Sequence, residues 1–322
     1  MFGLTFLSAT SKTTTHRVVP FRMGNLGGVA GYVAGGDEGA GSRTSRIDKI
    51  TFPADTKTTL SATLTSGREA PVGFANSGVA GYAAGGYNAA GYQNNIDKVT
   101  FPADTRTTLS ATLTTARANT AGFANSGGAG YVAGGFNGSN ISGIDKVSFA
   151  ADSKTTLSAT LTTARSDVSG FANSGVAGYV AGGQDSGLIS GIDKITFAAD
   201  TKTTLSATLT NARAYTAGFA NSGGAGYVAG GDDGAKISGI DKITFAADTK
   251  TTLSATLTTA TYAVAGFANS GVAGYVAGGS DNAGRVSRID KVSFAADSKT
   301  TLSATLTNAV RFASGFADSG TL

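Results

Sequence analysis

GYVAGGFNGSNISGIDKVSFAADSKTTLSATLTTA, residues 130–164, decides the fold, because the chain repeats this stretch with small changes along almost its whole length. A Gly-Gly pair marks each copy, at Gly35-Gly36, Gly85-Gly86, Gly134-Gly135, Gly182-Gly183, Gly230-Gly231 and Gly278-Gly279. Successive pairs lie 50, 49, 48, 48 and 48 residues apart. A fixed period of this length is typical of arrays in which each unit buries its faces only against its neighbours. We therefore expect one repeat domain over residues 29–322, preceded by an atypical segment, residues 1–28.

Each unit has the pattern of four short strands. In the third copy these strands are expected over residues 122–126, 130–133, 144–149 and 156–161, where period-2 alternation and residues such as Val and Thr favour strand over helix. Asn125–Gly128 and Ala151–Thr155 supply turn residues between them. Four short antiparallel strands in about 48 residues predict one blade of an all-β propeller.

The unit resembles the kelch repeat. The shared markers, in order along the third copy, are Gly134-Gly135, Asp152, Thr155, Leu157, Leu161 and Arg165. Two positions depart from the kelch pattern, because Ala151 stands where an aromatic residue is usual and Leu157 where kelch blades commonly carry Trp. The resemblance implies a propeller and leaves the activity open, since kelch propellers serve as enzymes, adaptors and adhesins alike.

Six units predict six blades. The chain ends on a seventh copy of the first strand, residues 315–319, with no further unit after it. The economical interpretation is that this strand completes the blade begun by residues 29–66 and closes the ring. The alternative is a seven-bladed ring whose last blade combines residues 1–28 with the terminal strand.

Composition argues against several function classes. The net charge of +4 comes largely from one Lys per repeat, so the chain has no basic patch for nucleic acid. It has no Cys, one His and no Trp, and no apolar run of membrane-spanning length, which predicts no membrane insertion. The N-terminus lacks the features of a signal peptide. No unit carries a nucleophile, base or metal cluster that its siblings lack, so we expect no cofactor, no metal and no enzyme activity.

The units differ from one another in two places only. One follows the Gly-Gly pair and the other follows the fourth strand. An up-and-down blade places both connections on the same face, where aromatic, amide and acidic side chains suit recognition of sugars or proteins. Neutral drift is the competing explanation. The candidate binding residues are Tyr87, Asn88, Tyr92, Phe136, Asn137, Gln184, Asp185, Tyr215, Asp232, Asp233, Tyr262, Asp281, Asn282, Arg285 and Phe312.

Three recurring polar residues are interpreted as structural. Each unit has an Asp in its third strand, such as Asp193. Together these carboxylates could form a ring that binds cations, but we expect each of them to pair with a residue of a neighbouring blade. An Arg such as Arg165 is expected to make a structural ion pair that single blades can lose, since Thr261 and Val310 replace it. An Asn such as Asn125 is expected to line the channel or bond blade to blade.

Low-charge repeats rich in Gly, Ala, Ser and Thr look like those of bacteriophage tail-associated or other virion proteins. This resemblance implies a receptor-binding or adhesion protein at a virion surface. Its expected location is the virion or the extracellular space, after assembly in the host cytoplasm. Its expected partners are a cell-surface glycan or protein and, through residues 1–28, other virion proteins. The alternative is a structural or decorating virion component, or a scaffold, with no ligand on the variable face.

Overall fold

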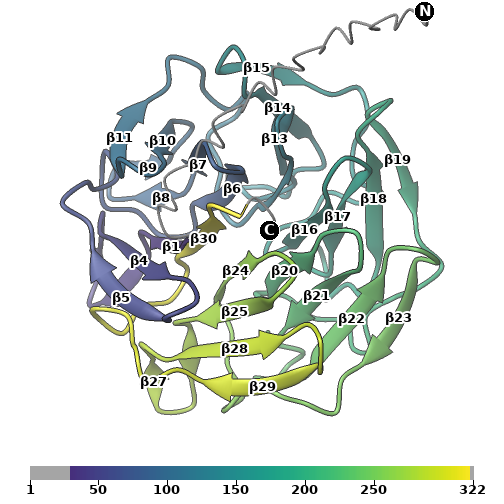
Figure 1. The fold of residues 1–322 in the computed structure, drawn as a ribbon. Helices are drawn as coiled ribbons and strands as arrows, with labels where there is room; N and C mark the ends of the chain where they lie inside the picture. The colour runs from purple at the N-terminus through teal and green to yellow at the C-terminus, as the bar shows by residue number, and fades with distance from the viewer. Residues whose placement is uncertain (1–29, 320–322) are drawn as a thin grey trace, which may run out of the picture.

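The computed structural model describes residues 30–319, which form six four-stranded antiparallel sheets arranged as blades around a central axis (Figure 1). We call the strands of a blade a, b, c and d from the axis outward. Blade 1 contains β30 (Ser314–Ala317), β1 (Ala30–Ala34), β4 (Ile47–Thr51) and β5 (Thr56–Thr59). Blade 2 contains β6 (Val72–Asn76), β7 (Ala80–Ala84), β10 (Ile96–Thr100) and β11 (Thr105–Thr108). Blade 3 contains β12 (Ala121–Asn125), β13 (Ala129–Ala133), β14 (Ile144–Ser148) and β15 (Ser153–Thr156).

The other blades repeat this pattern. Blade 4 contains β16 (Ser169–Asn173), β17 (Ala177–Ala181), β18 (Ile192–Thr196) and β19 (Thr201–Thr204). Blade 5 contains β20 (Ala217–Asn221), β21 (Ala225–Ala229), β22 (Ile240–Thr244) and β23 (Thr249–Thr252). Blade 6 contains β24 (Ala265–Asn269), β25 (Ala273–Ala277), β28 (Ile289–Ser293) and β29 (Ser298–Thr301). Three b–c connections form small hairpins, β2 (Asp37–Gly39) with β3 (Ser42–Arg43), β8 (Tyr87–Asn88) with β9 (Gly91–Tyr92), and β26 (Ser280–Asp281) with β27 (Gly284–Arg285).

The six-bladed, all-β prediction is confirmed, and the seven-bladed alternative is wrong. The last strand of the chain, β30, pairs antiparallel with the first, β1, in the register Gly31↔Ala317 to Ala34↔Ser314. In Figure 1 this yellow strand lies beside the purple one, so the first and last segments of the described chain share blade 1. Residues 1–28, expected to be an attachment arm or partial blade, lie outside the described residues, as does the end of the chain after Ser319. No helix among residues 30–319 is long and apolar enough to cross a membrane.

The prediction for strand d was wrong. Strand d of the third copy was expected over residues 156–161, but β15 spans Ser153–Thr156. The turn before it occupies Phe149–Asp152, and Asp152 ends that turn with a φ of 48°, so the outer strand begins directly after the Asp. The alternation in the following LSATL instead places Leu157 against the core and buries Leu161 to 3% exposure. Its apolar positions serve packing within an irregular connection to the next blade.

Aromatic stacks fill the space between blades. Phe123 of strand a and Tyr131 of strand b stack with ring centroids 5.2 Å apart, and Tyr131 stacks at 5.2 Å on Phe197 from the next blade. The Phe123 ring also covers Gly178 of that blade, where a Cβ atom would lie 1.9 Å from Phe123 Cδ2. Glycine at this position therefore lets the blades approach closely enough for the aromatic stack to form.

Neighbouring inner strands also meet at glycine. A Cβ on Gly170 would lie 2.2 Å from the backbone oxygen of Gly122 on the preceding inner strand. The same contact recurs around the ring, from Gly73 to Gly315. Because none of the six positions has room for a side chain, the axial channel is narrow and the inner strands form a tight collar.

A repeated three-residue contact connects each blade to the next. Lys146 Nζ lies 2.7 Å from Asp200 Oδ2 in the next blade, and Tyr131 donates from its hydroxyl to Asp200 Oδ1 at 2.9 Å. Burial and the bond to Asp200 raise the pKa of Tyr131, which stays a neutral donor. The contact closes the ring as well, since Lys291 and Tyr275 of blade 6 bind Asp55 of blade 1. The recurring Lys and turn Asp therefore serve inter-blade attachment.

Four of the six connections between blades place an arginine against the buried Asp in strand c of the next blade. Arg165 Nη2 lies 3.1 Å from Asp193 Oδ2, and both side chains are at most 2% exposed. The expected inter-blade pairing is confirmed, because Arg165 lies in the connection that leaves blade 3 and Asp193 in blade 4. Burial lowers the pKa of the Arg165 guanidinium, an effect that the Asp193 charge opposes.

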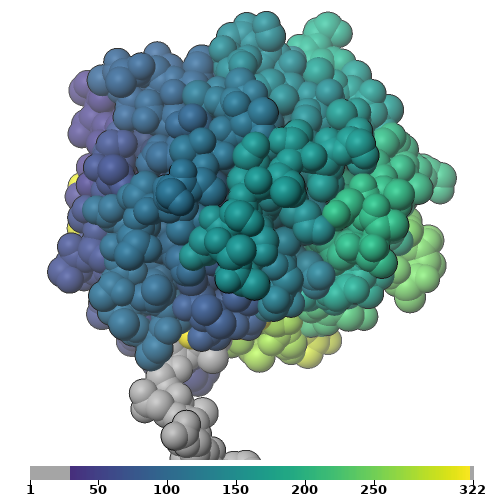
Figure 2. All heavy atoms as spheres, turned by 90° about the horizontal axis from the view of Figure 1, so that it is seen from above, coloured from purple at the N-terminus to yellow at the C-terminus, as the bar shows by residue number. Residues whose placement is uncertain are grey.

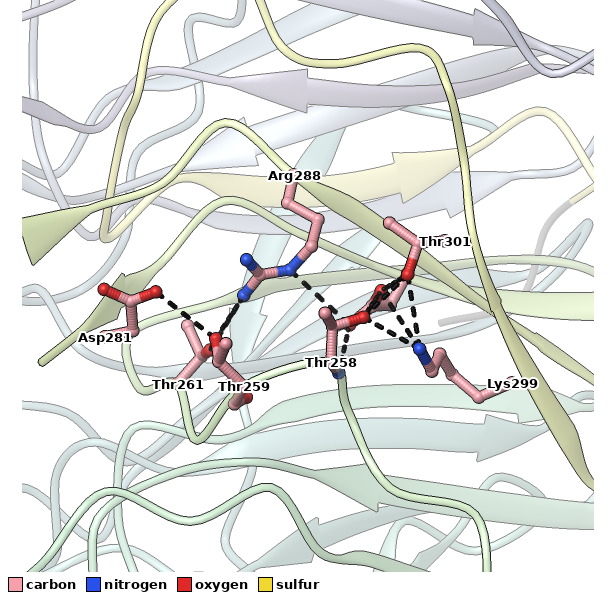
Figure 3. Close-up of polar contacts among 8 residues, drawn as sticks. Thr258, Thr259, Thr261, Asp281, Arg288, Lys299 and Thr301 are labelled. Atoms are coloured by element: carbon pink, nitrogen blue, oxygen red, sulfur yellow. Dashed lines mark hydrogen bonds and ion pairs between the residues drawn. The ribbon is translucent and has the colours of Figure 1, made fainter. Parts of the chain in front are cut away.

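Before blade 6 the connecting Arg is missing, and another arginine lies near the buried Asp of that blade. Thr261 replaces it before blade 6, and Arg288 replaces the Gly found at the corresponding position, Gly191, of blade 4 (Figure 3). Arg288 Nε lies 3.8 Å from Asp290 Oδ2, and its Nη2 donates to Thr261 Oγ1 at 3.3 Å. The loss of Arg before blade 6 is thus accompanied by a compensating residue, whereas in blade 1, where Val310 replaces the Arg, Asp48 accepts hydrogen bonds from Thr307 and Thr59.

The Asn of strand a bonds blade to blade. Asn125 Oδ1 accepts the backbone N–H of Gly175 in the next a–b turn at 3.0 Å, and its counterparts repeat this contact. Seen from the rim in Figure 2, the blades coloured blue to green pack side by side around the disc.

Candidate functional site

The two variable segments of the sequence lie together on one face, which we call the loop face. It consists of the b–c connections and the segments that link strand d to strand a of the next blade. Ser166 of one d–a segment forms an isolated β-bridge with Gln184 of a b–c connection, and the same bridge recurs at Ala214↔Asp232 and Tyr262↔Ser280. At blade 1 the bridge Asp37↔Arg311 joins the start of the ring to its end. Every blade therefore contributes both variable segments to the same face.

Six residues form a closed backbone ring around the axis on this face. They occupy equivalent d–a positions: Ala70, Asn119, Asp167, Tyr215, Ala263 and Phe312. The N–H of each donates to the carbonyl of its counterpart in the preceding connection, for example Tyr215 N to Asp167 O at 3.0 Å. We call this set the axial ring.

The axial ring requires a left-handed backbone. All six residues have φ between 49° and 61°, and for bulky side chains such as Tyr215 and Phe312 this conformation costs roughly 1–2 kcal/mol. The chain contains 47 glycines but places none in the ring. Ala70 and Ala263 adopt the same conformation as Tyr215 and Phe312, so the ring backbone forms with small and large side chains alike.

Candidate residues from blades 2 and 3 form a first aromatic cluster. Tyr87 and Tyr92 have ring centroids 5.0 Å apart, and Tyr92 lies 6.0 Å from Phe136 of the next blade, edge to face. All three rings are partly exposed. Arg43 covers Tyr87 with its guanidinium 4.8 Å from the ring centroid while it binds Glu69 at 2.8 Å. Burial, and then the neighbouring Tyr87, raise the pKa of Tyr92.

A second aromatic cluster adjoins the axis. Tyr215, Tyr262 and Phe312 come from three consecutive d–a segments, with centroid separations of 5.7, 5.8 and 6.3 Å and nearly perpendicular planes. Burial and the charge of Asp167 raise the pKa of Tyr215 to about 12, so its hydroxyl is neutral at physiological pH. Lys236 Nζ lies 5.4 Å from the Tyr262 centroid, and Arg311 Cζ lies 5.2 Å from that of Phe312.

Asp167 and Gln184 connect this cluster to blade 4. Gln184 Nε2 donates to Asp167 Oδ2 at 2.7 Å and to the Tyr215 hydroxyl at 2.9 Å, and Ser166 Oγ donates to the same carboxylate oxygen at 2.8 Å. Sequence reasoning missed Asp167 as a candidate. Its distinguishing feature, that it is the one carboxylate among the six axial-ring positions, is visible only once the structure has defined that ring.

Arg285, another candidate, lies in a charge cluster at the ring closure. Its Nη2 lies 2.7 Å from Asp37 Oδ2, which also accepts Arg311 Nε at 3.0 Å. Burial of Asp37 would raise its pKa, but the bonds from Arg285, the Gly39 backbone and Arg311 outweigh this effect, so the pKa is lowered. Blades 1 and 6 are therefore tied together on the loop face by one carboxylate and two guanidinium groups.

We expect Asp37→Asn to destabilise the protein by about 1–3 kcal/mol at pH 7, because the charge-assisted bonds from both arginines are weakened. A carboxyl with a lowered folded-state pKa contributes stability above its unfolded pKa of about 4 and loses it as the pH falls through the folded value. The difference in urea midpoint between the variant and the parent should therefore shrink below about pH 4. A gap that persists unchanged at pH 3 would contradict the assignment.

Most remaining candidates shape the tips of the b–c connections. The backbone N–H two residues on donates to the side-chain oxygen of each, as from Gly187 to Asp185 at 3.0 Å, the geometry of an Asx turn. The others in this group are Asn88, Asn137, Asp232, Asp233 and Asp281. Asn282 is exposed at the tip of the β26–β27 hairpin. These side chains set the geometry of the loops, and all but Asp232 lie beyond the bridge positions.

A cavity opens at the centre of the loop face, which we call the axial funnel. It has a volume of about 110 Å³, and its walls include Asn119, Asp167, Tyr215, Thr216 and Phe312. The inner-strand glycines lie at its base. Among residues 30–319, no group of three or more His, Cys, Asp or Glu side chains is placed to hold a metal ion. Comparison of the chain with protein-family models and with curated proteins finds no match.

Proposed function

We propose that this protein is a non-enzymatic binding module that attaches to a cell-surface glycan or protein through its loop face. A β-propeller supports such a role because it holds many loops on a rigid base. The observation that supports the proposal is the contrast between the residues that join the blades and the residues of the loop face. The Lys–Tyr–Asp contact between blades repeats in all six blades, whereas the differences between units concentrate on the loop face, where two clusters of partly exposed aromatic rings lie.

We further propose a place for the module on a bacteriophage virion, as a tail-associated receptor-binding or adhesion protein of kelch-like type. Residues 1–28 would attach it to other virion proteins, and the loop face would point to the host. The support is the resemblance of the repeats described above. The alternative, a structural or decorating component, predicts that the loop face tolerates substitution as well as the opposite face does.

Tyr92→Ala and Tyr215→Ala should each weaken attachment to target cells by tenfold or more, because aromatic side chains on rigid loops supply large contact areas at little entropic cost. The melting temperature should change little. At the axial ring this expectation has direct support, since Ala70 and Ala263 already occupy positions equivalent to Tyr215 with similar φ. Binding of labelled protein to intact cells, together with a glycan array, measures the effect.

The matched control is Val176→Ala, which truncates an apolar side chain that is 53% exposed in an a–b turn, on the opposite face. It should leave attachment intact. Equal tolerance of both faces would refute the binding role and favour the structural alternative. Consumption of the bound glycan by the parent protein, abolished by a loop-face variant, would refute the proposal that the module is not an enzyme.

A further inference from the structure

The axial funnel is sixfold in its backbone but not in its side chains. The axial ring presents two alanines, one Asn, one Asp, one Tyr and one Phe at equivalent positions. Its polar side chains, Asn119 and Asp167, are consecutive around the ring, and Tyr215 follows them. A ligand that enters the funnel therefore meets a carboxylate beside an aromatic wall made by Tyr215 and Phe312.

The one ionisable acid or base other than Tyr among the funnel's lining residues is acidic. Asp167 is the one carboxylate among the lining residues, which include no Lys or Arg. Its side chain is buried, with the residue 6% exposed, and it has no ion pair with any residue in the part of the chain that the structure describes. Burial raises the pKa of Asp167, and the hydrogen bonds from Ser166, Gln184 and Tyr215 offset this only in part.

Asp167 also keeps unused hydrogen-bonding capacity. Its Oδ2 accepts the bonds from Ser166 and Gln184, whereas its Oδ1 is buried with no hydrogen-bond partner among residues 30–319. Thr216 Oγ1, which also belongs to the funnel lining, is likewise buried without a hydrogen-bond partner among these residues. A ligand that donates several hydrogen bonds and carries a positive charge would complement both atoms.

The size of the funnel restricts the ligand to a slim group. A cavity of about 150 Å³ accepts a benzene ring, so the funnel, at about 110 Å³, is too small for a whole sugar ring. A planar guanidinium prefers a carboxylate with both oxygens free, but Oδ2 of Asp167 is already occupied. A compact ammonium group on an aliphatic chain meets both restrictions, and the faces of nearby aromatic rings attract it.

We propose that the axial funnel receives the ammonium group of one lysine side chain from a protein partner, with Asp167 as its counter-charge and Tyr215 and Phe312 as its wall. This inference rests on the proposed attachment function and goes beyond it, since it specifies that the partner is a protein and that the funnel binds one of its lysine side chains. The partner's surrounding surface would contact the two aromatic clusters.

The test uses the full-length protein and Nα-acetyl-L-lysine N-methylamide as the probe, titrated by calorimetry and by ligand-observed NMR. We expect binding with a Kd of about 1 mM or tighter, at least tenfold tighter than that of the norleucine analogue, which has the same chain without the charge. Asp167→Asn should remove this preference. The variant should fold, because Asn119 already occupies the equivalent position with the same φ of 59°. Asp185→Asn, the same change of charge on an exposed loop of the same face, is the matched control and should leave lysine binding unchanged.

Three results would overturn the inference: equal binding of the lysine and norleucine probes, equal effects of Asp167→Asn and Asp185→Asn, or funnel binding by methyl glycosides in place of the lysine probe. The proposed function is tested separately by Tyr92→Ala, which lies outside the funnel lining. If Tyr92→Ala weakens cell attachment while the lysine probe fails to bind, the attachment function stands and the lysine site falls. If the probe binds through Asp167 while substitutions of Tyr92, Tyr215 and Asp167 leave attachment unchanged, the funnel binds lysine but the attachment function is refuted.

Discussion

Deletion of residues 310–322 is expected to abolish cooperative folding. The truncated chain loses β30, which pairs with β1 over four residues and closes blade 1. It also loses Phe316, a fully buried ring that stacks 5.3 Å from Tyr32 and covers Gly81 of the next blade. The inner edge of β1 would be exposed, and an unpaired edge strand next to an open apolar surface promotes aggregation. Size-exclusion chromatography and thermal melting by circular dichroism measure the outcome.

Two other terminal deletions are the controls. Removal of residues 320–322, which follow the last described residue, and removal of residues 1–28, which precede the repeat domain, should each leave a cooperative melt. Retention of a soluble monomer with a cooperative transition after deletion of residues 310–322 would show that ring closure by β30 is dispensable. Loss of folding after removal of residues 1–28 would show that the propeller needs those residues to fold, which the repeat pattern does not predict.

Arg165→Thr is expected to destabilise the protein by about 3 kcal/mol, at the lower end of the cost of breaking a buried ion pair. The charge of Asp193 would stay buried, although Thr162 and Thr204 would still donate to it. The lower end is chosen because Asp48 is held natively by the same kinds of bond from Thr307 and Thr59, with Val310 at the position of the Arg.

The second substitution Gly191→Arg should restore at least half of this loss. Together the two changes reproduce the arrangement of blade 6, where Thr261 and Arg288 replace the Arg and Gly (Figure 3). A Cβ on Gly191 meets no atom closer than 3.7 Å, and the backbone there is not left-handed, so the larger residue can be accommodated. Gly191→Arg alone should not stabilise, because it brings a second cation to one carboxylate. Urea unfolding of the four proteins gives the coupling energy, and additive effects would contradict the compensation.

The sequence by itself determined the period, the strand class and the blade count. These properties are local, because the Gly-Gly pair, the alternation in IDKVSF and the Asn-Ser-Gly turn depend only on near neighbours along the chain. The position of the variable segments on one face also followed from the sequence, since it needs only the alternating direction of antiparallel strands. The outer strand was misplaced because alternation in LSATL has the same period as a strand, while the apolar partners of Leu161 belong to the core formed in the folded ring.

Only the tertiary structure decided which side chains meet. Lys146 and Asp200 are 54 residues apart, and Tyr215, Tyr262 and Phe312 are separated by 47 and 50 residues, so each contact requires blades docked side by side. The sequence identified these aromatic residues as candidates but did not show which of them contact one another. It also could not identify Asp167, because the unusual feature of that residue is its burial at the axis without a cation, and an axis exists only after all six blades have closed.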